Sequence, residues 1–206
     1  MADGFRPTLA IVFASIKVDR TRLCEMLHEA GMDILGATSS GEFINGHQSE
    51  GAAAILLLDL PREYYRIFFE VVGERDLVRV AQDLGNAGLH AFRKPAFILC
   101  SSGTSADGEI FAGDLLMHNL EETMGPGVPI YGGMAGDDAT FTGSFVFTHG
   151  KETDNGVAAL ILDQDKISLH GMAISGWKPI GIARKVTRSE GNWLYEIEGQ
   201  PALEMY

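Results

Sequence analysis

Three loops hold the polar side chains best suited to recognise a small molecule. The first follows a short apolar stretch and offers three hydroxyls, one glycine and one carboxylate, from Thr38, Ser39, Ser40, Gly41 and Glu42. Glycine lets backbone N–H groups approach an anionic group closely, and hydroxyls can donate or accept hydrogen bonds. We expect these residues to bind a ligand. An ordinary tight connection is the alternative, since it has the same composition.

The second loop also follows an apolar stretch and contains Gly132, Gly133, Asp137 and Asp138. A pair of carboxylates favours an ammonium group, whereas backbone amides exposed by glycine favour a carboxylate. Together these groups suit an amino acid or a small amine. Alternatively, Asp137 and Asp138 cap a turn of the backbone.

Ser101 and Ser102 begin the third loop, which joins an apolar stretch to a helical pattern. Such junctions in α/β sheets often receive anionic groups, so both serines are predicted ligand contacts. The loop lacks the lysine and spacing of a Walker motif and the glycine before the serine of a nucleophile elbow, so no catalytic residue is expected. Trp177 lies between turn-forming residues and is expected either to form a wall of the pocket or to close one end of the core.

The cysteines and histidines predict neither a disulfide framework nor a metal site. Cys24 and Cys100 are isolated in apolar patterns and are expected to be small core residues. The six histidines show no compact metal-ligand spacing. No cofactor is therefore expected. Haem is the alternative, because noncovalent haem needs only one axial ligand, which His47 or His170 could supply.

Composition narrows the class of protein. The 206 residues are 46% hydrophobic, enough for a substantial core, and contain no apolar run long enough to span a bilayer. The first residues lack the basic and apolar regions of a secretory signal. A net charge of -12 repels phosphate backbones, which argues against a nucleic-acid partner. We therefore expect a cytoplasmic globular protein without membrane insertion.

Hydrophobic periodicity predicts an α/β (mixed α+β) fold, with helices flanking mixed sheets. Strands are expected at residues 9–14, 33–37, 51–58, 65–72, 96–100, 128–132, 145–147, 157–162 and 167–174. Helices are expected between Asp19 and Gly31, around residues 77–88, and over residues 107–124. A C-terminal β-hairpin joins residues 185–188 to 193–197, and Pro201 is expected to open a helix.

The same order of elements, β-α-β-β-β, occurs over residues 8–73 and again over residues 94–176. Local sequence also matches, in residues 34–37 with 130–133 and in residues 51–59 with 156–163. These matches predict an internal duplication, in which the first two loops are related and border one shared cleft. Within that cleft, Glu42, Asp137 or Asp138 is expected to bind the cation of the ligand.

Four blocks of the sequence resemble the signature blocks of FIST domains, in the same order. The blocks are Leu35-Gly36-Ala37-Thr38-Ser39-Ser40-Gly41-Glu42, Tyr131-Gly132-Gly133-Met134-Ala135-Gly136-Asp137-Asp138, Gly176-Trp177-Lys178-Pro179 and Glu198-Gly199-Gln200-Pro201-Ala202-Leu203-Glu204. The similarity extends from about Thr8 to Tyr206. The chain, residues 1–206, thus resembles the amino-terminal portion of a FIST domain, and the smaller carboxy-terminal portion is expected to be missing.

This resemblance implies a bacterial sensory module that binds small ligands such as amino acids. It also implies an output partner, such as a histidine kinase, a cyclase or a chemotaxis receptor. Some family members are similar to haem-based nitric oxide sensors, so regulation of a partner kinase through haem is the main alternative. An uncharacterised enzyme or a scaffold without ligand is the third hypothesis, in which Cys100, Ser101 or Ser102 would carry any turnover.

Overall fold

The computed structural model describes residues 4–174, 176–191 and 193–205, which form two compact units. Unit 1 extends to Gly171, and unit 2 begins at Met172. Within these described ranges, no helix is both long enough and apolar enough to cross a lipid bilayer.

Capping residues set the beginning of two helices in unit 1. The Asp19 side chain accepts a hydrogen bond from the backbone N–H of Arg22 at 3.0 Å, and Asp76 accepts one from Val78 at 3.0 Å. Each carboxylate satisfies an N–H group that the first helical turn leaves unpaired. The helices of unit 1 are α1 (Arg20–Glu29), η1 (Arg62–Tyr64, a short 3-10 helix), α2 (Leu77–Ala91) and α3 (Gly113–Met124).

The strands of unit 1 form two main sheets and one separate hairpin. Sheet 1 has the order β10-β9-β2-β1-β5, sheet 2 has the order β6-β11-β7-β8, and β3 pairs with β4. The strands are β1 (Leu9–Ser15), β2 (Asp33–Ser39), β3 (Glu42–Ile44), β4 (His47–Ser49), β5 (Ala53–Leu58), β6 (Tyr65–Val71), β7 (Pro95–Ser101), β8 (Ile130–Met134), β9 (Val146–Thr148), β10 (Lys151–Thr153) and β11 (Gly156–Asp163).

Both sheets are built around the same pattern of three strands. β1 pairs parallel with β2 and antiparallel with β5, while β7 pairs parallel with β8 and antiparallel with β11. Two further strands pair with a strand from the other half of the chain: β6 of the first half pairs with β11, and β9 of the second half pairs with β2. The common pattern supports an internal duplication, which stays a prediction. The exchanged strands tie the two halves into one unit.

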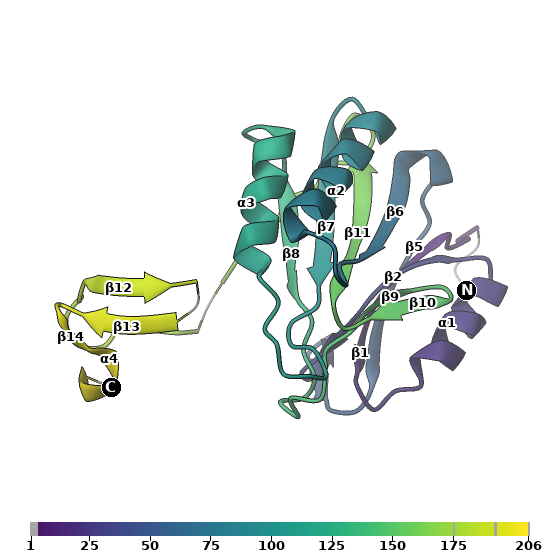
Figure 1. The fold of residues 1–206 in the computed structure, drawn as a ribbon. Helices are drawn as coiled ribbons and strands as arrows, with labels where there is room; N and C mark the ends of the chain where they lie inside the picture. Colours follow the sequence, from purple (N-terminus) through teal and green to yellow (C-terminus); the bar gives the residue numbers. More distant parts are fainter. Residues whose placement is uncertain (1–3, 175, 192, 206) are drawn as a thin grey trace. The chain divides into compact units, whose positions relative to one another are not determined.

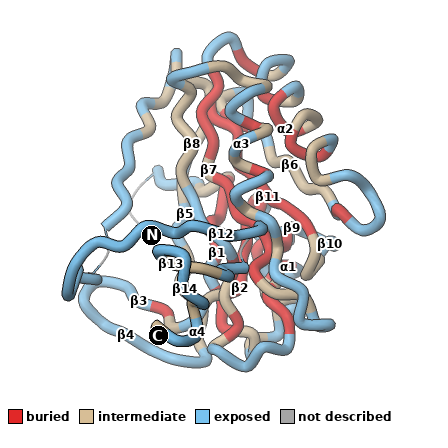
Figure 2. The backbone as a smooth tube through the Cα atoms, turned by 60° about the vertical axis from the view of Figure 1, so that its left-hand side comes forward, coloured by how far each residue is buried: buried red, intermediate tan, exposed pale blue. Residues whose placement is uncertain are grey.

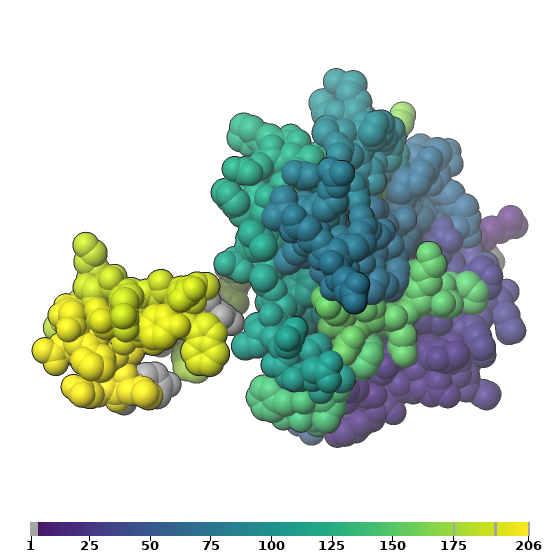
Figure 3. Space-filling view, viewed as in Figure 1, coloured from purple at the N-terminus to yellow at the C-terminus, as the bar shows by residue number. Residues whose placement is uncertain are grey.

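Unit 1 has four layers, namely α1, sheet 1, sheet 2, and the pair of helices α2 and α3 (Figure 1). Leu9 of sheet 1 and Leu160 of sheet 2 belong to the core between the sheets. On the outer faces, Leu27 of α1 packs on sheet 1, and Leu84 of α2 with Leu120 of α3 packs on sheet 2. Figure 3 shows α2 and α3, in teal, over this face of unit 1.

Burial on both faces explains the continuous apolar runs that the sequence shows in several strands. β7 and β11 have another sheet on one side and helices on the other, and both are buried over most of their length (Figure 2). A strand in this position has no solvent face, so it lacks the alternation of polar and apolar residues found in half-exposed strands.

Unit 2 is a small sheet with one short helix. It consists of β12 (Val186–Glu190), β13 (Trp193–Ile197), β14 (Gln200–Pro201) and α4 (Ala202–Met205). β12 and β13 pair antiparallel, which confirms the predicted C-terminal hairpin. Pro201 ends β14, and the helix expected to open at this proline begins at the next residue.

The mixed α/β architecture is confirmed, but one predicted strand is wrong and one predicted helix begins later than expected. Residues 167–174 form no strand, because Ile167 and Leu169 pack against the core between the sheets without pairing to a neighbour. α3 begins at Gly113, since residues 107–112 form a turn, a single β-bridge and an extended connection. The β3–β4 hairpin and β10 had no predicted counterpart, because three residues are too few to show a hydrophobic period.

Candidate functional site

The first two predicted loops contact each other directly in unit 1. The backbone N–H of Gly136 donates to the carbonyl oxygen of Thr38 at 2.9 Å, and the N–H of Asp138 donates to Ser40 Oγ at 3.1 Å. A Cβ atom at Gly136 would lie only 2.5 Å from Ser40 Oγ, so glycine is required for this approach. The structure therefore places these two loops in direct contact, and the shared cleft that the internal repeat predicted between them stays a prediction.

Hydrogen bonds within the protein occupy the polar groups of the first loop. The Thr38 hydroxyl is buried and accepts the N–H of Phe145 at 2.8 Å. Glu42 is also buried, and its carboxylate accepts bonds from Ser39 Oγ at 2.8 Å and from the N–H of Ala52 at 3.1 Å. These contacts fix the loop after β2 and the start of β5, and binding of ligand by this loop, Gly41 included, stays a prediction.

The two carboxylates of the second loop also have partners within unit 1. Asp137 is buried and accepts the N–H of Thr142 at 2.9 Å, which is the turn-capping arrangement considered from the sequence. Asp138 accepts the hydroxyl of the buried Ser15 at 2.6 Å and lies 3.9 Å from the Lys17 ammonium group. The Asp137 carboxylate thus holds a turn of its own loop, the Asp138 carboxylate joins this loop to the end of β1, and a role in binding a cation stays a prediction.

The two serines of the third loop have different surroundings. Ser102 is buried, accepts the N–H of Gly156 at 3.1 Å and lies 3.4 Å from two backbone carbonyl oxygens, so it ties the end of β7 to the start of β11. Ser101 is only 4% exposed, and its hydroxyl has no hydrogen-bond partner among the described residues. Ser101 is one of the residues that line a pocket.

A pocket of about 350 Å³ lies between α3 and the edge strand β8, and we name it the α3–β8 pocket. Its volume is within the usual range for sites that hold small molecules. Three of the predicted binding residues, Ser101, Gly132 and Gly133, belong to its lining. The full lining is Leu99, Ser101, Gly113, Asp114, Leu116, Met117, Ile130, Tyr131, Gly132, Gly133 and Met134.

The pattern of side chains on β7 and β8 explains why a pocket forms here. Leu99 is paired with Gly132, and Ser101 with Met134, so these four residues share the face of sheet 2 that carries α3. Gly132 contributes no side chain to this face and leaves a hollow beneath the helix. It has a φ of +149°, and a Cβ atom would collide with the Leu99 carbonyl oxygen, so no other residue fits.

The α3–β8 pocket is mainly apolar, with a small set of polar groups at defined places. Ser101, at the end of β7, contributes a hydroxyl group. Asp114, in the first turn of α3, is exposed, and its carboxylate has no ion pair among the described residues. β8 pairs only with β7, so its other edge is open within this part of the chain. Because pairing alternates along a strand, Gly132 and Met134 present backbone N–H and C=O groups to that edge.

The sequence predicted lining residues of the α3–β8 pocket on β7 and β8 but none on α3. Asp114 and Met117 were placed inside a helix expected to begin at residue 107, where nothing distinguished them from other surface residues. The useful signal was the pair Gly132 and Gly133 inside a predicted strand, since glycine in a strand marks a place without side-chain packing. Trp177 belongs to unit 2, and its predicted contact with a ligand stays a prediction.

The cysteines and histidines of the described residues show no reactive or metal-binding cluster. Both cysteines are buried, so the expectation of small core residues is confirmed, and burial raises the pKa of Cys24 to about 11 and that of Cys100 to about 12. His47 lies on β4 and His170 follows β11, both exposed. The structure adds no observation in favour of haem at either residue.

Comparison with known proteins identifies a family for almost the whole chain. The model of the FIST N domain matches residues 8–200. The chain is also similar to an uncharacterized protein of Methanocaldococcus jannaschii, MJ1623, with 35% identity over 83 residues. This second match covers 38% of the chain and 15% of the length of the relative, so it carries no argument about the activity of the whole relative.

Proposed function

We propose that this chain, which belongs to the FIST N domain family, senses a small metabolite and binds it in the α3–β8 pocket. Domains of this family generally sense small ligands in signal transduction. The single observation that carries the proposed site is Ser101, a pocket-lining residue that is only 4% exposed and whose hydroxyl has no hydrogen-bond partner among the described residues. A ligand in the pocket would supply the hydrogen-bond partner that the protein does not give this hydroxyl.

The chemistry of the pocket favours an apolar amino acid or a related amine. Met117, Leu116 and Ile130 offer apolar surface to a side chain, and methionine adapts its shape to different ligands. The Asp114 carboxylate suits an ammonium group, and Ser101 with the open edge of β8 can bond a carboxylate or a carbonyl. The predicted ligand class is thus retained, but the carboxylate that we assign to its ammonium group is now Asp114.

Signalling would follow from the position of the ligand between two separate elements. A molecule in the pocket contacts both α3 and β8, and it favours the arrangement of these elements that it binds better. The output partner in this proposal is a signalling protein such as a histidine kinase, a cyclase or a chemotaxis receptor, which detects the favoured arrangement.

A thermal-shift screen of apolar amino acids and the corresponding amines tests this function. A ligand that binds only the folded chain raises the melting temperature by mass action. Loss of a charge-assisted hydrogen bond costs about 1.5–3 kcal/mol, so Asp114→Asn should weaken binding by roughly 10-fold to 100-fold. Asp107→Asn, a change of an exposed acid outside the pocket lining, is the matched control and should leave binding unchanged.

The serine pair provides a second, independent test of the site. Ser101→Ala should remove the thermal shift caused by the ligand while leaving the stability of the unliganded chain nearly unchanged. Ser102→Ala should do the opposite, because Ser102 bonds the backbone of Gly156 and does not line the pocket. A ligand shift that survives both Ser101→Ala and Asp114→Asn would rule out the α3–β8 pocket as the binding site.

A further inference from the structure

A second pocket in unit 1 has a different chemical character. It has a volume of about 450 Å³ and lies among the end of α1, the start of β2, η1, β6 and the turn between β9 and β10. We infer that this pocket binds a small multivalent oxyanion, through two guanidinium groups and two imidazole rings. Its lining is His28, Met32, Asp33, Ile34, Arg62, Tyr65, Arg66, Ile67, Thr148 and His149.

The pocket concentrates basic groups on an acidic protein. The chain has a net charge of -12, yet Arg62, Arg66, His28 and His149 all line this one pocket. Asp33 is the one carboxylate in the lining, so the arginines outnumber it even when both histidines are neutral. A local excess of positive charge attracts anions against the field of the whole protein.

Backbone carbonyl groups hold the two arginines in place at the pocket. Arg62 donates to the backbone carbonyl oxygen of Gly31 and pairs with the carboxylate of Asp33, to which the Tyr65 hydroxyl also donates at 2.8 Å. Arg66 donates from one terminal nitrogen, Nη1, to the carbonyl oxygens of Arg62 at 3.0 Å and Tyr65 at 2.7 Å.

These bonds leave donors available for a ligand. No partner of Arg66 Nε or Nη2 occurs among the described residues, and these two nitrogens form the planar fork that binds carboxylate or phosphate in two places. Arg66 is thus already positioned, which lowers the entropy lost when an anion binds.

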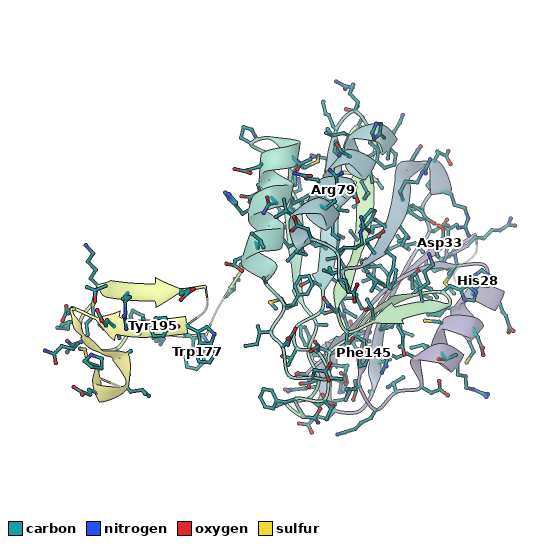
Figure 4. The ribbon with its side chains drawn as sticks, in the orientation of Figure 1. His28, Asp33, Arg79, Phe145, Trp177 and Tyr195 are labelled. Carbon is teal, nitrogen blue, oxygen red and sulfur yellow. The ribbon has the colours of Figure 1, made fainter. Side chains whose placement is uncertain are left out.

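The two histidines form a parallel stack at the same pocket. The ring centroids of His28, at the end of α1, and His149, in the β9–β10 turn, are 3.6 Å apart, and the ring planes differ by 11°. Figure 4 shows His28 and Asp33 at this end of unit 1. No ring nitrogen of either histidine has a hydrogen-bond partner in the part of the chain that the structure describes. Each ring can therefore donate an N–H group to an anion even when neutral.

Isothermal titration of the whole chain with sodium pyrophosphate, and separately with succinate, tests this inference. Sodium chloride at equal ionic strength controls for screening. Binding of either anion is expected, with an affinity that Arg66→Gln lowers by about tenfold. Pyrophosphate binding alone would identify a phosphate ligand, and succinate binding alone a carboxylate ligand.

Matched variants separate this pocket from general charge effects. Arg79→Gln removes an exposed arginine of α2 outside the pocket, and it should leave anion affinity unchanged (Figure 4). Asp114→Asn should also leave it unchanged, because the two pockets share no residue. If Arg66→Gln fails to fold, His149→Asn gives the same test at an exposed turn. No binding of either anion, or equal loss in Arg79→Gln, would overturn the inference.

Discussion

Replacement of Gly132 by alanine should destabilise unit 1 far more than the same change at the adjacent Gly133. Gly132 has a φ of +149°, which L side chains rarely adopt, and its Cβ atom would collide with the carbonyl oxygen of Leu99. At Gly133 a Cβ atom would meet no other atom within 4 Å. The two variants add the same methyl group to the same strand, so they differ in local geometry alone.

The magnitude follows from two contributions at Gly132. An alanine held in a backbone conformation reserved for glycine costs about 1–3 kcal/mol. Displacement of β8 from β7 to relieve the collision adds a penalty of about 1–3 kcal/mol, typical of overpacking. In a chain of 206 residues, each 1 kcal/mol lowers the melting temperature by roughly 2–4 °C. Gly132→Ala should therefore melt at least about 4 °C lower, and Gly133→Ala within about 2 °C of the unaltered chain.

Far-ultraviolet circular dichroism is the appropriate assay for this pair. Both tryptophans, Trp177 and Trp193, lie in unit 2, so tryptophan fluorescence would not report on β8. Urea unfolding followed by circular dichroism gives the free energy of unfolding for each variant. Equal stability of the Gly132→Ala and Gly133→Ala variants would refute the steric argument and the explanation of the pocket built on it.

Three further outcomes are expected. Burial raises the pKa of Cys24 from 9.0 to about 11 and that of Cys100 to about 12, so the stability these thiols contribute is present below pH 9 and is lost as the pH rises toward 11 and 12. Urea unfolding at about pH 8 and about pH 10 should show this loss, and equal stability at both would contradict it. Ser102→Ala should lower the free energy of unfolding by about 1–3 kcal/mol, because it leaves a buried backbone group unpaired, and a neutral result in the same assay would disprove that role. Thermal unfolding followed by tryptophan fluorescence, which reports Trp177 and Trp193, should not coincide with unfolding followed by circular dichroism, whereas one shared transition would show that the two units unfold together.

The fold class could be predicted from the sequence because local patterns determine strand burial. The apolar runs near residues 9–14, 96–100 and 157–162 correspond to β1, β7 and β11, which lie in the interior of their sheets. The partners of the other strands could not be predicted, since the exchange of β6 and β9 between sheets depends on contacts far apart in the chain. Ile167 and Leu169 suggested a strand that does not exist, because these apolar residues pack against the core without pairing in a sheet.

The candidate site was predicted in part, and the limit was the hydrogen bonding of the acidic residues. Glu42 and Asp137 have the residue type expected of ligand contacts, but bonds to Ala52 and Thr142 use their carboxylates within the protein. These bonds depend on how the loops fold, so residue type alone does not identify them. Asp114, by contrast, became a candidate only when the structure placed the first turn of α3 beside β8.

The methyl signals of methionine provide the most direct test of ligand binding at the α3–β8 pocket. Met117 on α3 and Met134 on β8 both line this pocket, whereas Met26 on α1 is exposed and lies outside the pocket lining. A chain labelled with ¹³C at the methionine methyl groups should be titrated with leucine, isoleucine, methionine, phenylalanine and the amines that lack their carboxylates. We expect at least one compound to shift the signals of Met117 and Met134 while that of Met26 stays unchanged. Saturable shifts confined to other methionines, or no shift with any of these compounds, would contradict it.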